Sequence, residues 1–202
     1  MMLSHGKVIA VALAAFLSVS VQALRAEEFD YLDTRSNVVT TTNNMKYQIA
    51  INNTFQLLGE LHHRQKSRDL LFRVSFVAFG NGVDIVLIHA ERLQDETGIL
   101  NYDYLPRQNL SEVEFGFREQ CIPVEAETGL KTNREANFVR DRGYELTLPF
   151  LLTQYLSASS DGNAEVVIAY GRSVESCDSI SDAFRSDTQN RIDEAINVKL
   201  VH

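Results

Sequence analysis

The sequence predicts a mainly β protein, either an antiparallel sheet or a β-sandwich, with one or two helices. Two segments rich in β-branched and aromatic residues, 70–79 and 83–93, flank a Gly-Asn-Gly turn at 80–82, a pattern typical of a β-hairpin. A second pair of such segments, 144–156 and 164–170, flanks another polar turn. Predicted strands do not alternate with long amphipathic helices, so a parallel α/β fold is disfavoured and an α+β domain is the alternative.

The first predicted strand carries apolar residues at alternate positions. The series runs from Tyr47 through Ile49, Ile51 and Phe55 to Leu57. Side chains two residues apart project from the same face of a strand, so this alternation predicts an extended segment. A helix over the same segment stays open as an alternative, because some of these residues also lie one helical turn apart.

The hairpin with the Gly-Asn-Gly turn is expected in the core of the sheet. Both of its strands are apolar on nearly both faces at their centres, which is typical of strands covered on two sides. Its side chains expected to be mostly buried are Phe72, Val74, Phe76, Ile85 and Leu87.

Further elements are predicted downstream of this hairpin. The segment 112–118 alternates apolar with polar residues and is expected to be a strand. In the second hairpin, Pro149 lacks the N–H group that a central strand uses, so a helix that starts near Thr147 is the alternative for its first arm. The tail over 179–197 is expected to be helical, since it opens with a Ser-Asp cap and carries apolar residues at helical spacing.

The N-terminal segment 1–23 has the three parts of a cleavable secretory signal. Lys7 supplies a positive charge, and an apolar core follows from Val8 to Val19. This core is shorter than the roughly 20 apolar residues that a membrane-spanning helix needs. Cleavage is expected after Ala23, with an uncleaved anchor as the alternative. The sequence therefore predicts a periplasmic or secreted protein that has no transmembrane anchor after signal cleavage.

The rest of the chain is expected to form one folded unit. Residues 24–44 are predicted to be a polar N-terminal lead-in that becomes extended over 38–42, and 45–202 a single disulfide-stapled globular domain. The formal charge of the whole chain is −8, and it becomes −9 without segment 1–23, which contains one Lys and no acidic residue. Such a chain has no general electrostatic reason to bind nucleic acid, and we expect none.

Two cysteines, Cys121 and Cys177, are expected to form a disulfide. An even pair in an oxidising compartment is most simply a structural bond. On the chain-entropy model, a closed loop of 57 residues stabilises the fold by about 4 kcal/mol. A metal site or a catalytic thiol is the alternative, although neither cysteine has a CxxC partner.

One basic stretch stands out in this acidic chain and is the candidate binding site. It contains His62, His63, Arg64, Lys66 and Arg68. These groups could bind an anionic sugar, a phosphate or an acidic partner surface, and histidine titrates near pH 6. The alternative is a solvated turn between two apolar segments, in which the charges only keep a loop in water.

His89 and Glu91 lie two residues apart and are expected on the same face of a strand. A histidine and a carboxylate could begin a metal site that His62 or His63 would complete. Three or four converging ligands are needed, so the favoured interpretation is that the strand leaves the core here. No metal and no cofactor are therefore expected.

Two other groups of polar residues are weaker candidates. Asp161, Asn163 and Glu165 match the first ligand positions of a calcium loop, but the bidentate glutamate that should follow is missing. A polar hairpin turn explains the same residues. Tyr102 and Tyr104 could form an exposed aromatic pair for sugar or protein contacts, or bury their rings and leave their hydroxyls in water.

The sequence does not predict a reaction. It contains no nucleophile elbow, no HExxH zinc motif and no glycine-rich phosphate-binding loop. The first hypothesis is an exported non-catalytic domain that binds a partner protein or a cell-envelope component. The alternative is an extracytoplasmic hydrolase that acts on an envelope polymer through His62, His63, His89 and Glu91. Convergence of at least two of these groups in a pocket would favour the hydrolase.

Overall fold

The computed structural model describes residues 29–67 and 69–201. The predicted signal segment 1–23, with its cleavage after Ala23, lies outside the described residues. Arg68 of the basic stretch lies outside them too.

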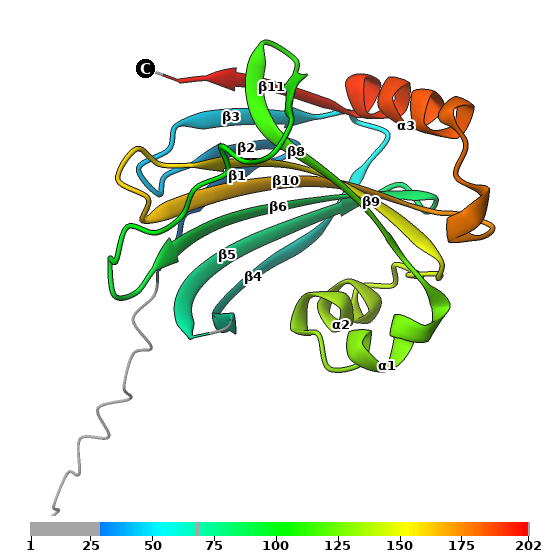
Figure 1. Ribbon diagram of the computed structural model, residues 1–202, viewed down its shortest axis with the longest axis horizontal. Helices are drawn as coiled ribbons and strands as arrows, with labels where there is room; N and C mark the ends of the chain where they lie inside the picture. The colour runs from blue at the N-terminus through cyan, green and yellow to red at the C-terminus, as the bar shows by residue number, and fades with distance from the viewer. Residues whose placement is uncertain (1–28, 68, 202) are drawn as a thin grey trace, which may run out of the picture.

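The described chain is mainly β, as predicted, with two antiparallel sheets and three α-helices (Figure 1). A four-stranded sheet has the order β1-β2-β3-β11, and a seven-stranded sheet has the order β4-β5-β6-β10-β9-β8-β7. The small sheet contains β1 (Leu32–Arg35), β2 (Val38–Thr41), β3 (Tyr47–Ile51) and β11 (Ile196–Leu200). The large sheet contains β4 (Gln56–Ser67), β5 (Leu70–Gly80), β6 (Asp84–Leu93), β7 (Arg107–Leu110), β8 (Val113–Ile122), β9 (Phe150–Ala158) and β10 (Ala164–Ser173). The helices are α1 (Glu127–Leu130), α2 (Arg134–Asp141) and α3 (Asp182–Ala195).

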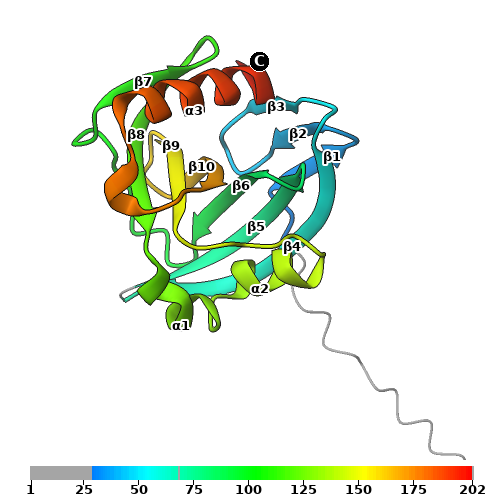
Figure 2. The same ribbon diagram turned by 90° about the vertical axis from the view of Figure 1, so that its right-hand side faces the viewer.

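The two sheets pack across the main hydrophobic core. Apolar side chains from both sheets meet there and are fully buried, among them Val39, Ile49, Val86 and Ile168. Figures 1 and 2 show the small sheet and α3 on one side of the large sheet, and α1 and α2 on its opposite side. We call the first side the core face of the large sheet and the second side its pocket face.

A second hydrophobic cluster lies on the pocket face. Phe76 and Ile85 from the sheet pack there with Val139 of α2. Helix α2 begins after Asn133, whose side-chain oxygen accepts a hydrogen bond from the backbone N–H of Ala136. This cap and this packing place the first turn of α2 over the sheet.

The predicted central hairpin is confirmed as β5 and β6. Strand β5 lies between β4 and β6, and β6 lies between β5 and β10. Phe76 and Val74 are fully buried, and Phe72 and Ile85 are nearly so. Leu87 is only partly buried because it lines a small apolar recess beneath α2.

The other predicted strands are confirmed as well. The segment 47–58 is extended rather than helical, although a turn at 52–55 divides it between β3 and β4. The segment 112–118 belongs to β8, and the second hairpin is β9 with β10. The alternative helix near Thr147 is wrong. Pro149 immediately precedes the first residue of β9, so its missing N–H removes no bond from the strand ladder.

The ends of the domain contain more strand than the sequence predicts. Residues 24–44, expected as a lead-in, include β1 and β2, where Leu32 and Val39 are buried in the main core. The predicted tail helix is confirmed as α3, but the chain continues as β11, which pairs with β3. In these polar segments a few buried side chains and the pairing of the backbone stabilise the strands.

Cys121 and Cys177 form a disulfide, as predicted, with their α-carbons 5.7 Å apart. The bond connects β8 with the short helix η2 (Cys177–Ser179), which precedes α3. No helix in the described ranges is long and apolar enough to cross a membrane.

Candidate functional site

A pocket with a volume of about 500 Å³ opens on the pocket face of the large sheet. Strands β5, β6, β9 and β10 contribute its floor, and the loop at 94–106 between β6 and β7 contributes a wall. We call it the sheet pocket. Its lining residues are Gln65, Ser67, Leu70, Phe72, His89, Glu91, Ile99, Leu100, Asn101, Tyr102, Tyr104, Arg118, Gln154, Leu156, Glu165 and Val167.

Strand register brings three chemically important side chains into one row across the sheet. His63 of β4 lies opposite Val74 of β5, and Val74 lies opposite Glu91 of β6. Glu91 in turn lies opposite Glu165 of β10. His89, two residues before Glu91, projects from the same face. Three segments that are far apart in the sequence therefore supply one polar cluster.

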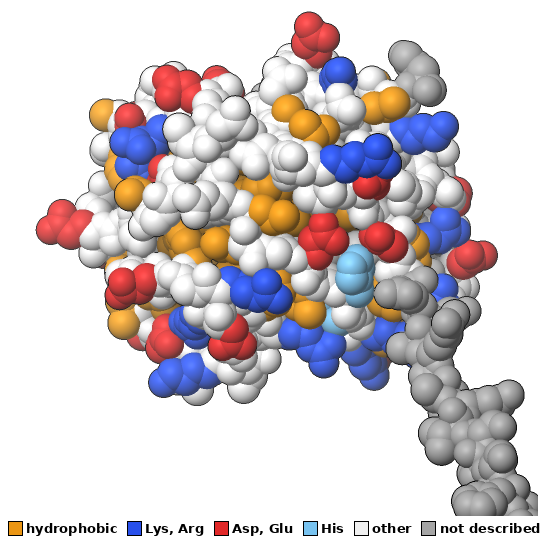
Figure 3. Space-filling model, turned by 180° about the vertical axis from the view of Figure 1, so that it is seen from behind, with side chains coloured by type: hydrophobic (Ala, Val, Ile, Leu, Met, Phe, Trp, Pro, Cys, Tyr) orange, Lys and Arg blue, Asp and Glu red, His pale blue; other side chains and the backbone are white. Residues whose placement is uncertain are grey.

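Helix α2 adds a carboxylate to this cluster. Glu135, in the first turn of α2, places Oε1 3.5 Å from Nε2 of His63 and 3.6 Å from Nδ1 of His89. The same nitrogen of His89 lies 3.2 Å from Oε1 of Glu91. The side chains of His63, His89, Glu91 and Glu135 are all largely buried. Figure 3 shows acidic side chains gathered beside a histidine, next to a hollow with apolar side chains.

The carboxylates keep His89 positively charged. Burial of His89 disfavours its charged form, but the charge of Glu135 and the hydrogen bond and charge of Glu91 outweigh this effect. The pKa of His89 is therefore raised to about 9. At neutral pH the ring is an imidazolium ion whose Nδ1 is paired with two carboxylates.

Glu91 and Glu165 form a carboxylate pair in the floor of the pocket. They lie directly opposite each other on β6 and β10 and are only 9% and 6% exposed. The hydroxyl of Tyr102, from the loop that forms the wall, donates a hydrogen bond to Glu165. The loop is therefore tied to the floor of the pocket by one of its acidic groups.

Burial and the charge of Glu91 together raise the pKa of Glu165 to about 7. The hydrogen bond from Tyr102 and the charge of His89 oppose this increase but do not cancel it. Burial and the negative charge of Glu165 also raise the pKa of the Tyr102 hydroxyl above its ordinary value. One of the two carboxyl groups thus exchanges a proton with solvent near neutral pH.

A buried asparagine supports the backbone on which the pair stands. Asn43, which is 2% exposed, donates from its side-chain nitrogen to the carbonyl oxygens of Glu91 and Glu165 over 3.1 and 2.8 Å. Because a single amide group binds both strands, the two glutamates are fixed relative to each other.

The rim of the pocket combines polar and aromatic groups. Arg118 donates two hydrogen bonds to Oε1 of Gln154, over 2.9 and 2.7 Å. Tyr104 is 76% exposed, and its ring centre lies 6.5 Å from that of Tyr102. The aromatic pair expected from the sequence is therefore split: one hydroxyl binds inside the pocket while the other ring faces solvent.

The basic stretch, expected as a turn or an anion site, lies in β4 instead. Charged residues are tolerated there because β4 is an edge strand of the large sheet. His63 points into the cluster, whereas alternation sends His62, Arg64 and Lys66 to the opposite face. His62 Nδ1 lies 3.1 Å from Oγ of Ser75, on that face. The stretch therefore does not present its side chains on a single surface.

The metal hypotheses find no geometric support. Within residues 29–67 and 69–201, no group of three or more histidine, cysteine or acidic side chains is arranged to hold a metal ion. In the calcium-like segment, the carboxylate of Asp161 accepts hydrogen bonds from Ser159 and from the backbone of Asn163, as in a polar turn. Glu165 instead belongs to the sheet pocket.

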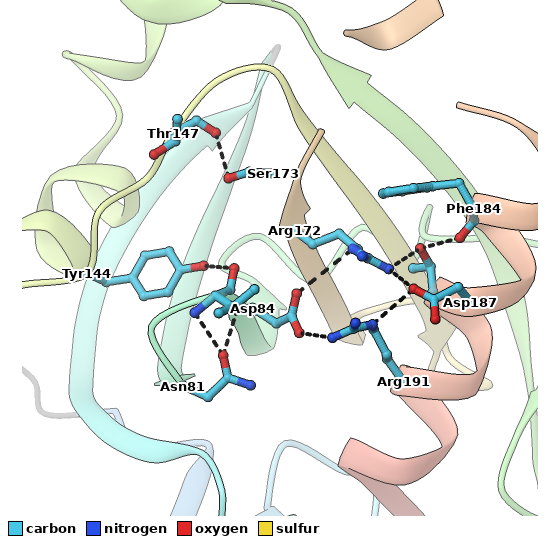
Figure 4. Close-up of polar contacts among 11 residues, drawn as sticks. Asn81, Asp84, Tyr144, Thr147, Arg172, Ser173, Phe184, Asp187 and Arg191 are labelled. Carbon is cyan, nitrogen blue, oxygen red and sulfur yellow. Dashed lines mark hydrogen bonds and ion pairs between the residues drawn. The ribbon is translucent and has the colours of Figure 1, made fainter. Parts of the chain in front are cut away.

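A second buried charge cluster lies away from the pocket and has a structural role (Figure 4). Asp84, at the start of β6 and 2% exposed, is paired with Arg191 over 3.4 Å and with Arg172 over 4.0 Å. Both arginines also bind Asp187 of α3, over 3.0 and 2.8 Å. Two acidic and two basic groups compensate one another, and the cluster ties α3 to the large sheet.

Sequence reasoning identified only part of the polar cluster. His63, His89 and Glu91 were candidates, and the structure brings them together, whereas His62 lies elsewhere. Glu135 was missed because no sequence pattern links a residue of a short helix to a distant strand. Glu165 was considered only as a calcium ligand, although its alternation within β10 could have placed it on the same face as Val167.

The chain matches no family model, no curated protein and no solved structure. The chemistry of the site itself is therefore the basis for a functional proposal.

Proposed function

We propose that this protein is an exported, non-catalytic domain that binds a cell-envelope component by enclosing a small polar group of it in the sheet pocket. The observation that carries the proposal is a concave site in which polar side chains outnumber apolar ones and the carboxyl groups of Glu91 and Glu165 meet in the floor. Its volume of about 500 Å³ lies within the range of small-molecule sites.

Export is supported by the signal-like segment and by the disulfide. Bonds such as that between Cys121 and Cys177 persist mainly in oxidising compartments outside the cytoplasm. An envelope component would be within reach of a protein in that location.

Binding is favoured over catalysis by the protonation of His89. A general base must hold a free lone pair near neutral pH, but His89 is kept protonated by Glu91 and Glu135. Both cysteine thiols are used in the disulfide, so neither is a nucleophile. The imidazolium of His89 therefore organises carboxylates rather than activates water.

Hydrolysis is the second candidate, and the carboxylate pair favours it. A carboxyl group with a pKa near the working pH is suited to general acid catalysis, and Glu165 has a pKa of about 7. Glu91 would then act as the base. In this hydrolase the catalytic groups would be the carboxyl groups of Glu91 and Glu165, and His62 would take no part.

The experiment uses the mature protein from Leu24 and a panel of soluble envelope fragments, sugars and amines, followed by NMR. In a Gln154→Trp variant an indole ring would fill the sheet pocket. The control variant, Gln48→Trp, places the same ring on the far side of the small sheet, away from the pocket. Binding that Gln154→Trp abolishes and Gln48→Trp preserves supports the proposal. A compound that is cleaved by the wild type, but not by Glu91→Gln, would support the hydrolase instead. Binding that Gln154→Trp leaves unchanged would refute the pocket as the site.

A further inference from the structure

The chemistry of the sheet pocket also indicates which class of ligand it takes, an inference that rests on the proposed function. Three carboxylates, those of Glu91, Glu135 and Glu165, meet one imidazolium, that of His89. Among the described residues no Lys or Arg forms an ion pair with any of these three carboxylates. Glu91 and Glu165 line the sheet pocket and Glu135 adjoins His89 from α2, so the largely buried carboxylates outnumber the buried imidazolium. Arg118, the guanidinium group of the lining, is exposed and binds Gln154.

The cluster around Asp84 shows how the same fold treats a buried carboxylate that has only a structural role. Asp84 is 2% exposed and lies near two guanidinium groups, those of Arg172 and Arg191. Glu165 is 6% exposed, and it accepts a hydrogen bond from the neutral hydroxyl of Tyr102. The one imidazolium near Glu165 is shared with Glu91 and Glu135, and a buried anion that is only partly compensated is costly. A cation that binds beside it reduces this cost.

We propose that the ligand is an aminopolyol, such as an amino sugar, whose ammonium group lies between Glu91 and Glu165. Three amide side chains of the lining, those of Gln65, Asn101 and Gln154, offer hydrogen bonds to hydroxyl groups. The exposed ring of Tyr104 offers an apolar surface to the C–H groups of a sugar or polyol. Charge, hydrogen bonding and an aromatic surface are thus combined in one pocket of about 500 Å³.

Binding of such a ligand requires that Glu165 be ionised. The proton that Glu165 holds below pH 7 passes from its carboxyl oxygen to water or buffer when the ammonium group arrives, and no other covalent bond is broken or formed. The ionisable groups that face this position are His63 of β4, His89 and Glu91 of β6, Arg118 of β8, Glu135 of α2, and Tyr102 and Tyr104 of the loop.

The test is calorimetric titration of the mature protein with glucamine and with sorbitol at pH 6, 7 and 8. These compounds differ only in an amino group, which like that of lysine stays protonated over this range. Glucamine should bind about tenfold more tightly at pH 8 than at pH 6, because Glu165 loses its proton in between. At pH 6, in buffers of different ionisation enthalpy, binding should release roughly one proton.

Two matched variants test whether the pH dependence of glucamine binding comes from the carboxylate pair Glu91 and Glu165. Glu165→Gln should weaken glucamine binding at pH 8 by about tenfold or more and should abolish its pH dependence. Glu114→Gln makes the same chemical change at an exposed position of β8 and should alter neither property.

Each other outcome overturns the inference in a distinguishable way. Equal affinity for sorbitol and glucamine, or binding of Ca²⁺ in place of glucamine, would reject the ligand class. If glucamine does not bind, but another compound binds to the wild type and not to Gln154→Trp, the inference fails and the proposed function stands. If no compound of the panel is sensitive to Gln154→Trp, both fail.

Discussion

Replacement of Glu165 by glutamine should change how the stability of the protein depends on pH. The carboxyl group has an ordinary pKa of 4.5, and burial together with the charge of Glu91 raises this value to about 7 in the folded protein. Between these values the folded chain binds more protons than the unfolded chain. Its free energy of unfolding therefore falls as the pH rises.

The two pKa values give the size of this effect. Between pH 5 and pH 8, a group that titrates at 7 when folded and at 4.5 when unfolded removes about 2.5 kcal/mol of stability. Glutamine resembles the protonated acid but cannot ionise. The Glu165→Gln variant should therefore match the wild type near pH 5 and exceed its stability by about 2.5 kcal/mol at pH 8. The stabilising contribution of His89 also falls as the pH rises, because its pKa is raised in the folded protein. His89 is present in both proteins, so this contribution largely cancels in the difference between them.

Urea denaturation at four pH values from 5 to 8, followed by circular dichroism, measures this difference. Glu114→Gln, at an exposed position of β8, serves as the control and should give a difference that is small and constant with pH. A Glu165→Gln curve parallel to that of the wild type would show that Glu165 has an ordinary pKa. The sheet pocket would then lack the partly compensated buried carboxylate that the proposed cationic ligand requires.

Three further predictions concern stability and binding. Replacing both Cys121 and Cys177 by serine should lower the free energy of unfolding by about 4 kcal/mol, measured by denaturation, and a loss below about 1 kcal/mol would contradict the loop-closure estimate. Phe76→Ala should lower the free energy of unfolding by about 3–5 kcal/mol, because the Phe76 ring is fully buried and its centre lies 4.9 Å from that of the His89 ring. Chemical denaturation at pH 7 measures this loss. Neutralising the Arg and Lys residues of the basic stretch (62–68) should change stability by less than about 1 kcal/mol. If that stretch binds an acidic partner, recovery of the partner in pull-downs from envelope extract should fall more at low salt than at high salt, and equal recovery would exclude it.

Local patterns predicted the fold well because strands and turns are encoded over short distances. The Gly-Asn-Gly turn and its apolar flanks specified β5 and β6, and the Ser-Asp cap specified the start of α3. The extended segment expected over 38–42 corresponds to β2, whereas the short strand β1 was not predicted, because its polar residues gain stability from pairing with β2 rather than from their own composition.

The candidate site was less accessible to sequence reasoning, because it depends on register between distant strands. His89 and Glu91 share a face by simple alternation, and this part was predicted. The opposition of Glu91 and Glu165 requires that β6 pair with β10, across 70 intervening residues. The approach of Glu135 depends on how α2 packs on the sheet, which only tertiary structure determines.

A single irregularity in β4 determines which of its side chains reach the pocket. Leu57 lies opposite Phe79, but Gly59 lies opposite Ala78, so Leu58 is an extra residue that forms a β-bulge. Beyond the bulge, odd-numbered residues of β4 share the pocket face, and His63 meets Glu135 there. Without the extra residue every later side chain would project from the other face. The pocket would then receive the even-numbered basic residues of the stretch, whose charges would neutralise the carboxylates that we propose to be left for a cationic ligand.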